Sequence, residues 1–186
     1  MSKETGSAGM DIGTMAVRGA KQSEGVRLKN LYHVECRGKD GKLKWTDEFS
    51  NRVVDVGLTD LIDKYTQGSG YSAEHYVGLT STTPAHAAGD TMASKSWSEV
   101  VAYGVASRPA YVPVSGAAGV VSNSGTPAAF DINADTTVIG GAFICTSGTK
   151  GETASTLYSV GAFTGGDKSL DDGDQLNVTV SLSVTP

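Results

Sequence analysis

Apolar and polar residues alternate along much of the chain, and this period of two predicts β-strands. In the last and clearest run, every second position from Leu176 to Val184 is apolar and the positions between are polar. One face of such a strand enters a core and the other meets water or a partner. Similar short runs lie at residues 28–36, 43–49, 75–80, 99–106, 110–114, 128–132, 138–145 and 156–163. The pattern therefore predicts a mainly β fold.

The first two runs predict a β-hairpin over residues 28–50. They are separated by Gly38-Lys-Asp-Gly41, and Asp-Gly between two strand-like runs is a strong hairpin signal. Trp45 and Phe49 then share one face of the second strand, because side chains alternate along a strand.

One segment, residues 51–66, has helical spacing instead. Its apolar residues recur three or four positions apart, at Val54, Leu58, Leu61, Ile62 and Tyr65. Ser50 or Asn51 is a suitable N-cap for this helix. Gly57 weakens a helix relative to alanine, so we interpret it as a position of tight packing.

Prolines and glycines modify the later strands, which occupy residues 75–186. Pro109 and Pro113 cannot donate to a strand ladder, so their strand belongs at a sheet edge or carries a bulge. The apolar run from Val138 to Cys145 contains Gly140 and Gly141, which favours a strand buried on both faces or a close-packed bend. Short strands joined by Gly-rich turns indicate a β-sandwich or jelly-roll-like domain over residues 28–186.

Residues 1–27 have the composition of an extended N-terminal arm. They are rich in Gly, Ser, Lys and Glu and carry only isolated apolar residues, among them Met10, Ile12, Met15 and Val17. Such a segment cannot bury enough apolar surface to offset its ordering entropy. It is either a disordered tail or a strap that orders on a neighbouring subunit. In the second case, these four apolar residues are the candidate contacts with the partner.

The charge pattern narrows the possible partners. The chain has 20 acidic and 15 basic residues, and its basic residues are scattered apart from Lys39, Lys42 and Lys44. Nucleic-acid binding requires a basic face, and a membrane span requires roughly 20 apolar residues in sequence. We therefore expect no nucleic-acid partner and no membrane partner. No apolar stretch typical of a signal peptide follows Met1, which predicts synthesis in a cytoplasm.

Motifs for catalysis, cofactors and metals are weak. Gly148–Thr153 resembles a phosphate-binding loop only in composition, and Gly68–Ala73 matches a loose nucleotide-binding pattern in the wrong order of helix and strand. The three histidines, His33, His75 and His86, have no metal-binding spacing. We expect no catalytic residue, no cofactor and no metal site, and therefore not an enzyme.

Two further groups of residues have more than one interpretation. Asp171, Asp172 and Asp174 form the densest acidic cluster, which is typical of a polar turn, although a calcium site is conceivable. Cys36 and Cys145 have no CxxC spacing and are expected to be reduced thiols. A single long-range disulfide between them stays open.

A series of short segments occurs in a fixed order along the chain. The segments are Tyr76-Val-Gly-Leu79, Ala88-Gly-Asp-Thr-Met92, Trp97-Ser-Glu-Val100, Tyr103 through Arg108-Pro-Ala110, Val121-Ser-Asn123, Ala129-Phe130, Gly140-Gly-Ala-Phe143, Leu157-Tyr158 and Gly173-Asp-Gln-Leu-Asn-Val-Thr179. This series resembles a group of small structural proteins found in the virions of tailed bacteriophages, and the resemblance covers roughly residues 50 to 183.

The resemblance implies a capsid decoration, or cement, protein. Such a protein binds the outer surface of the head and clamps neighbouring major capsid proteins, usually as a homodimer or homotrimer. It is assembled in the host cytoplasm and resides on the capsid surface of the virion. The alternative implied by the same group is a structural protein of the tail or fibre that contacts the host surface.

Overall fold

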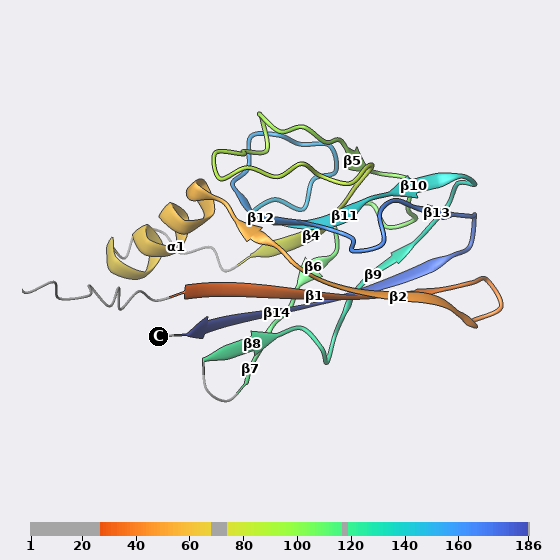
Figure 1. Ribbon diagram of the computed structural model, residues 1–186, viewed down its shortest axis with the longest axis horizontal. Coiled ribbons are helices and arrows are strands. Elements are labelled where there is room, and N and C mark those ends of the chain that lie inside the picture. The colour runs from red at the N-terminus through yellow and green to blue at the C-terminus, as the bar shows by residue number, and fades with distance from the viewer. Residues whose placement is uncertain (1–26, 68–73, 117–118, 186) are drawn as a thin grey trace, which may run out of the picture.

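The computed structural model describes residues 27–67, 74–116 and 119–185. These residues form a mainly β fold of two six-stranded antiparallel sheets with one helix (Figure 1). β-strands β1, β2 and β14 lie in one layer and β4, β11 and β12 in a second, with α1 at one end (Figure 1). The predicted mainly β class is confirmed. The two layers agree with a β-sandwich, and their strand orders do not confirm a jelly roll.

The first sheet contains the two longest strands of the described residues, β1 and β14. Its strands are β1 (Arg27–Arg37), β2 (Leu43–Ser50), β7 (Val114–Ser115), β8 (Val120–Ser122), β9 (Ala128–Asp131) and β14 (Gln175–Thr185). They follow the order β2-β1-β14-β8-β7. β9 pairs with the first part of β14 and β8 with a later part of the same edge.

The second sheet is built from shorter strands. They are β3 (Arg52–Val53), β4 (His75–Thr80), β5 (Glu99–Val100), β6 (Ala110–Tyr111), β11 (Gly141–Cys145) and β12 (Leu157–Ala162). Their order is β3-β12-β11-β4-β5, and β6 also pairs with β4. A separate ribbon joins β10 (Thr137–Ile139) to β13 (Lys168–Leu170). Within the described ranges, no helix has the length and apolar character that crossing a membrane requires.

The predicted hairpin is confirmed as β1 and β2, which pair from Leu31 opposite Ser50 to Arg37 opposite Leu43. Gly41 has a φ of 76°, a left-handed conformation that glycine adopts without strain. A hydrogen bond from the Gly38 N–H to the Lys42 carbonyl closes the turn. The Asp-Gly signal therefore fixed both the turn and the register of the strands.

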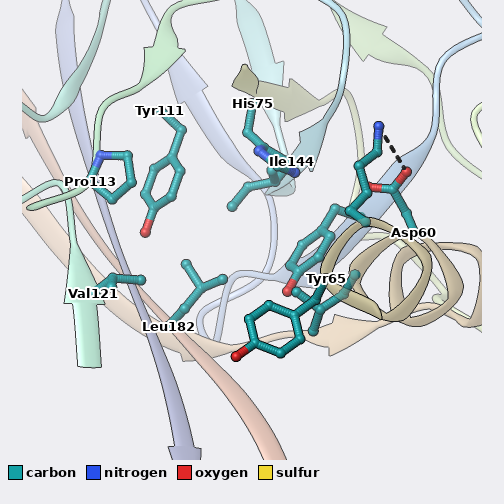
Figure 2. A pocket seen from close by; sticks show the side chains of 11 residues that line it. Asp60, Tyr65, His75, Tyr111, Pro113, Val121, Ile144 and Leu182 are labelled. Carbon is teal, nitrogen blue, oxygen red and sulfur yellow. Dashed lines mark ion pairs between the residues drawn. The ribbon is translucent and has the colours of Figure 1, made fainter. Parts of the chain in front are cut away.

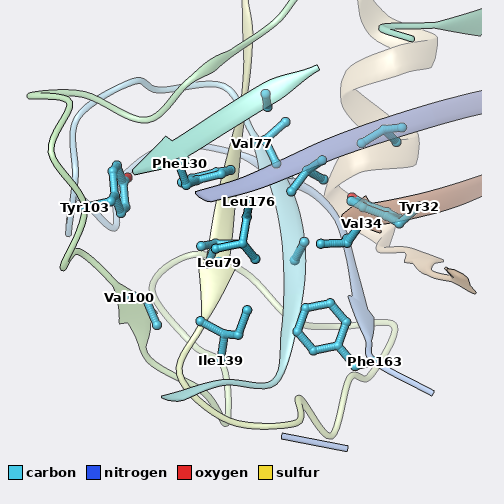
Figure 3. Close-up of a cluster of buried hydrophobic side chains, with 14 of the residues drawn as sticks. Tyr32, Val34, Val77, Leu79, Val100, Tyr103, Phe130, Ile139, Phe163 and Leu176 are labelled. Carbon is cyan, nitrogen blue, oxygen red and sulfur yellow. The ribbon is translucent and has the colours of Figure 1, made fainter. Parts of the chain in front are cut away.

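The main core lies between the two sheets (Figure 3). Leu176, Val178 and Val180 of β14 are fully buried there, as the alternation predicts. Val77 and Leu79 of β4 belong to the same cluster from the opposite sheet. The core ends before the strand does, because Val184 on the same face of β14 is 44% exposed.

A second apolar cluster covers the other face of the second sheet. Phe143 of β11 is its centre, and its ring lies against Gly78, where an added Cβ would come within 2.2 Å of the ring. Met92 and Trp97, from the long segment between β4 and β5, pack in the same cluster. The second sheet is therefore buried on both faces, which explains the nearly continuous apolar sequence of β11.

The helix differs from its prediction in start and in environment. α1 spans Asp55–Gln67 rather than residues 51–66, so neither Ser50 nor Asn51 is its N-cap. Arg52 and Val53 are strand residues because they pair with Val160 and Ser159 of β12. Tertiary pairing thus outweighs the local helical pattern at this end.

Most apolar residues of α1 are not in the core. Val54, just before the helix, is fully buried, whereas Leu58 is 41%, Leu61 39% and Tyr65 90% exposed. Gly57 does mark a tight contact, since an added Cβ would lie 2.4 Å from the Tyr158 carbonyl oxygen. The helix packs through its first turn and leaves its later apolar residues at the surface.

The predicted strand over residues 99–106 is wrong beyond Val100. Only Glu99–Val100 forms a strand, and Val101 and Val105 are exposed while Tyr103 is buried. The predicted strand over residues 110–114 is divided between the two sheets, as β6 and β7. The edge position predicted from the prolines is confirmed for both, because within the described residues β6 pairs only with β4 and β7 only with β8. The run from Val138 to Cys145 combines both alternatives. It bends at Gly140 between β10 and β11, and β11 is buried on both faces.

Candidate functional site

A pocket of about 650 Å³ lies between α1 and one end of the sandwich (Figure 2). Seven elements and one connecting residue meet around it. Its lining residues are Asp60, Leu61, Lys64 and Tyr65 of α1, His75 of β4, Tyr111 of β6, Pro113, Val121 of β8, Ile144 of β11, Tyr158 of β12 and Leu182 of β14. The pocket falls within the size range of ligand and peptide-side-chain sites.

The pocket wall is apolar and aromatic. Tyr111 donates a hydrogen bond from its hydroxyl to the Val180 carbonyl at 3.3 Å, so its polar atom is used inside the fold. Tyr158 packs edge to face with the His75 ring, with 5.5 Å between their centroids. Burial, with a smaller effect of the Asp60 charge, raises the pKa of Tyr158 to about 12. Burial also raises the pKa of Tyr111, so both phenols stay neutral at ordinary pH.

Among the described lining residues, the acidic and basic side chains are those of one ion pair on α1. Lys64 Nζ lies 3.8 Å from Asp60 Oδ1, an i,i+4 pair on the helix surface (Figure 2). Such pairs stabilise a helix by only about 0.3–0.5 kcal/mol. The pocket thus offers apolar contact with a polar rim, which is the usual anatomy of a protein-binding surface.

Apolar side chains continue from the pocket onto the surface beside it. We call these residues the end face, namely Leu61, Tyr65, Pro113, Leu182 and Val184. Val184 belongs to it because it lies two positions after Leu182 on the same face of β14. Figure 2 shows Tyr111 and Tyr65 on opposite sides of the pocket, with Leu182 between them. Contiguous exposed apolar surface of this kind marks interaction sites.

The segment that the sequence predicts to be an N-terminal arm leads into the domain beside the end face. Arg27 pairs with Thr185 and Leu28 with Val184, so the first residues of β1 lie next to the last residues of β14. The four candidate contact residues, Met10, Ile12, Met15 and Val17, lie outside the described residues. The structure shows that the chain enters the domain from this segment next to the last residues of β14.

A buried ion pair forms a second polar centre, which the sequence did not predict. Arg108 is 1% exposed, and its Nε and Nη2 donate to the two carboxylate oxygens of Glu99 at 2.8 and 2.7 Å. Its guanidinium also donates to the carbonyls of Ser147 and Glu152. Every face of this charge is therefore occupied by groups of the fold.

This ion pair joins β5, the segment that contains Arg108, and the turn between β11 and β12. Burial opposes the charge on Arg108, but the hydrogen bonds to Glu99, together with the charge interactions with Cys145, Glu99 and Tyr103, outweigh it and hold the pKa of Arg108 above its ordinary value. The Glu99 carboxylate also accepts a hydrogen bond from the Gly151 N–H at 2.8 Å. Arg108 lies 5.5 Å from the Phe143 ring centroid, against the second apolar cluster. We interpret the pair as a structural tie rather than a reactive site.

The acidic cluster is a turn, as its composition predicts. Asp174 is buried, accepts a hydrogen bond from the Asp171 N–H at 3.0 Å and pairs with Lys44 Nζ at 2.7 Å. Gly173 has a φ of 86°, which fits its place in the tight turn before β14. In the described part of the chain, no group of three or more His, Cys, Asp or Glu residues could hold a metal ion.

The cysteines and histidines are dispersed. Cys36 and Cys145 are free and buried in different apolar clusters, so the expected reduced thiols are confirmed. Burial raises the pKa of Cys36 to about 11, which disfavours its reactive thiolate. His33 lies on the outer face of the first sheet near Glu35, with 3.6 Å between Nε2 and the carboxylate. His75 lies at the pocket.

Of the two glycine-rich motifs, the structure describes only the one at residues 148–153. Residues 148–153 form a turn between β11 and β12, and the Gly148 carbonyl accepts a hydrogen bond from the Arg108 N–H at 2.7 Å. That turn is structural, as expected. The motif Gly68–Ala73 lies outside the described residues.

Comparisons of the chain with protein-family models, with curated proteins and with solved structures found no match.

Proposed function

We propose that this chain is a capsid decoration protein of a tailed phage, a non-enzymatic component that binds the outer surface of the head and clamps neighbouring major capsid proteins. The observation that carries the proposal is the end face, an apolar surface at the point where the N-terminal arm joins the domain. A folded domain whose described residues leave an apolar surface exposed, next to a segment predicted to be an arm, is suited to contact rather than to chemistry.

Three of the segments that resemble virion proteins lie in central strands of the second sheet. Tyr76–Leu79 lies in β4, Gly140–Phe143 covers the bend into β11, and Leu157-Tyr158 begins β12. These three segments build the second sheet. The resemblance thus supports a shared scaffold, and the end face supports a function in binding on that scaffold.

The buried charged side chains of Arg108, Glu99 and Asp174 are bound to other groups of the fold. Arg108 and Glu99 bind each other and the backbone of the loop that contains Gly151. Asp174 binds Lys44 and the backbone of its own turn. This arrangement favours a structural protein over a phage enzyme.

The test uses phage particles that lack the protein. Without it, we expect the heads to release DNA at a lower temperature, and purified wild-type protein to restore the original temperature. The variant Leu61→Glu should fail to restore it, because a charge is placed on the end face. Leu58→Glu is the matched control, since Leu58 is equally exposed on α1 but does not line the pocket.

Two results would overturn the proposal. One is an unchanged release temperature in particles without the protein. The other is a copy number of a few to tens per particle instead of hundreds, which would indicate a tail or fibre component. Gel densitometry of purified particles measures the copy number directly.

A further inference from the structure

We propose that the pocket beside α1 binds residues 10–17 of a second copy of this chain, and that two copies exchange these segments reciprocally. This inference rests on the proposed function, which places copies of the protein side by side. The partner at the end face is then a second copy of the chain, and the pocket is the binding site for its arm.

The chemistry of the segment fits the pocket. Residues 10–17 contain four apolar side chains, Met10, Ile12, Met15 and Val17, in an arm otherwise dominated by small and polar residues. Methionine fills irregular apolar cavities and makes favourable contacts between sulfur and aromatic rings. The pocket provides such rings in Tyr111 and Tyr158, beside the aliphatic Leu61 and Leu182.

The charges are also compatible. The segment contains one acidic residue, Asp11, and is followed by the basic Arg18. The pocket rim likewise carries one acid and one base, Asp60 and Lys64, which pair with each other across 3.8 Å. Over residues 10–18 the charges of Asp11 and Arg18 cancel, as those of Asp60 and Lys64 do at the rim, so apolar burial is not opposed by a net repulsion between like charges.

The position of the arm permits exchange. Ten peptide units separate Val17 from Arg27, and an extended chain of ten residues spans at most about 33–36 Å. A domain of this size has a radius of gyration of roughly 15 Å. Residues 10–17 can therefore extend beyond their own domain and lie against a neighbour.

A dimer with two-fold symmetry would bring the arm of each copy to the pocket of the other. The arm begins beside Val184, and Leu182 of the pocket lies two positions earlier on the same face of β14. Two copies that meet head to head at this end bring each arm next to the pocket of the other, which is the self-complementary contact of a two-fold dimer.

The competing occupant is the arm of the same chain, and the two cases differ in how much apolar surface they bury. Folding back in cis would cover the pocket but leave Val184, which is 44% exposed and does not line the pocket, in contact with water. Reciprocal exchange fills both pockets and also brings the two end faces together, so it buries more apolar surface per chain. We therefore assign the pocket to the arm of the second copy.

The most direct test is a pair of engineered cysteines in the full-length chain, Ile12→Cys with Leu61→Cys. Oxidised glutathione should then produce a covalent dimer on a non-reducing gel, which a reductant converts to monomer. The native Cys36 and Cys145 are buried and do not compete. The control pair, Ile12→Cys with Leu58→Cys, uses an equally exposed position outside the pocket and should form at least ten-fold less dimer.

Sedimentation velocity on the purified chain without engineered cysteines provides an independent measurement. We expect the wild-type protein and Leu58→Glu to sediment as dimers at micromolar concentration. Leu61→Glu and the double variant Ile12→Ser with Met15→Ser should sediment as monomers. Because Leu61 is partly exposed, its substitution leaves the core intact, and a matching urea midpoint confirms that the variant is folded.

The outcomes separate this proposal from the proposed function. A disulfide formed only within one chain, with a wild-type monomer, would overturn exchange and establish the arm in cis. A dimer that survives both Leu61→Glu and the arm variant would overturn the pocket as the site. Each result uses free protein, so it leaves the particle experiment to decide whether the protein stabilises heads.

Discussion

The outer face of the second sheet and the end face are both apolar, yet the described chain covers only the first of them. On the sheet, Phe143 is fully buried beneath Trp97 and Met92. On the end face, Leu61 remains 39% and Tyr65 90% exposed. The first surface is therefore part of the stability of the domain, whereas the second is available for binding. Apolar residues at regular spacing therefore do not by themselves show which side chains are buried in the core.

The largest loss of stability is expected when the buried Arg108 is removed, beside the second apolar cluster. Arg108→Ala leaves the Glu99 carboxylate buried without its partner, and we expect a loss of about 3–5 kcal/mol in the free energy of unfolding. Urea unfolding measures this loss. The double variant Arg108→Met with Glu99→Leu should recover most of it, because neither charge then remains. A loss below about 1 kcal/mol for Arg108→Ala would contradict the structural role.

Alkaline pH should lower the free energy of unfolding through Tyr158, which lines the pocket and belongs to the main core. Its pKa in the folded state is about 12, above the unfolded value of 10.0, so the folded state disfavours the phenolate. The associated stability is complete below pH 10 and is lost as the pH rises through about 12. At about 1.4 kcal/mol per pKa unit, the loss reaches up to about 3 kcal/mol.

Tyr158→Phe isolates this contribution from that of the other tyrosines. Its urea midpoint should fall less between pH 9 and pH 12 than the wild-type midpoint. Equal falls in the two proteins would show that Tyr158 ionises as readily in the folded state as in the unfolded chain.

Gly57→Ala probes the single turn of α1 that is anchored to the sheet. Alanine favours helix formation by about 1 kcal/mol over glycine, but its Cβ would meet the Tyr158 carbonyl oxygen at 2.4 Å. We expect a net loss of about 1–2 kcal/mol in unfolding free energy, since overpacking costs more than the propensity gains. The exposed Thr59→Ala is the control and should change stability by less than about 0.5 kcal/mol. A stabilised Gly57→Ala would refute the close contact.

The smallest effect on stability is expected at the end face. Leu61→Glu should change the free energy of unfolding by no more than about 0.5 kcal/mol, because Leu61 is already partly exposed in the domain. Measured at low protein concentration, this value excludes contributions from self-association. A loss of 2 kcal/mol or more would place Leu61 in the core and remove the distinction between the two surfaces.

Local signals in the sequence were enough for part of the fold. The Asp-Gly turn located the β1–β2 hairpin, and the alternation from Leu176 to Val180 located the buried face of β14. Both features depend on neighbours in sequence. The start of α1 was mispredicted because Arg52 and Val53 pair with β12, more than 100 residues away. Nothing within residues 51–66 reveals that pairing.

The candidate sites were less accessible from sequence for the same reason. The pocket requires side chains from α1, β4, β6, β8, β11, β12 and β14, whose positions follow only from the complete sandwich. Arg108 finds its acceptors 9, 39 and 44 residues away along the chain. The four apolar residues of the arm were visible in the composition, but the pocket proposed to receive them was not.

The most direct test of the central claim, that the domain acts by contact through its end face, is an electron cryo-microscopy map of intact phage particles. The account predicts density for the sandwich on the outside of the head, repeated with the shell symmetry, with Leu61 and Tyr65 buried against a neighbouring subunit. Density confined to the tail, or an end face that points into solvent in every copy, would contradict it.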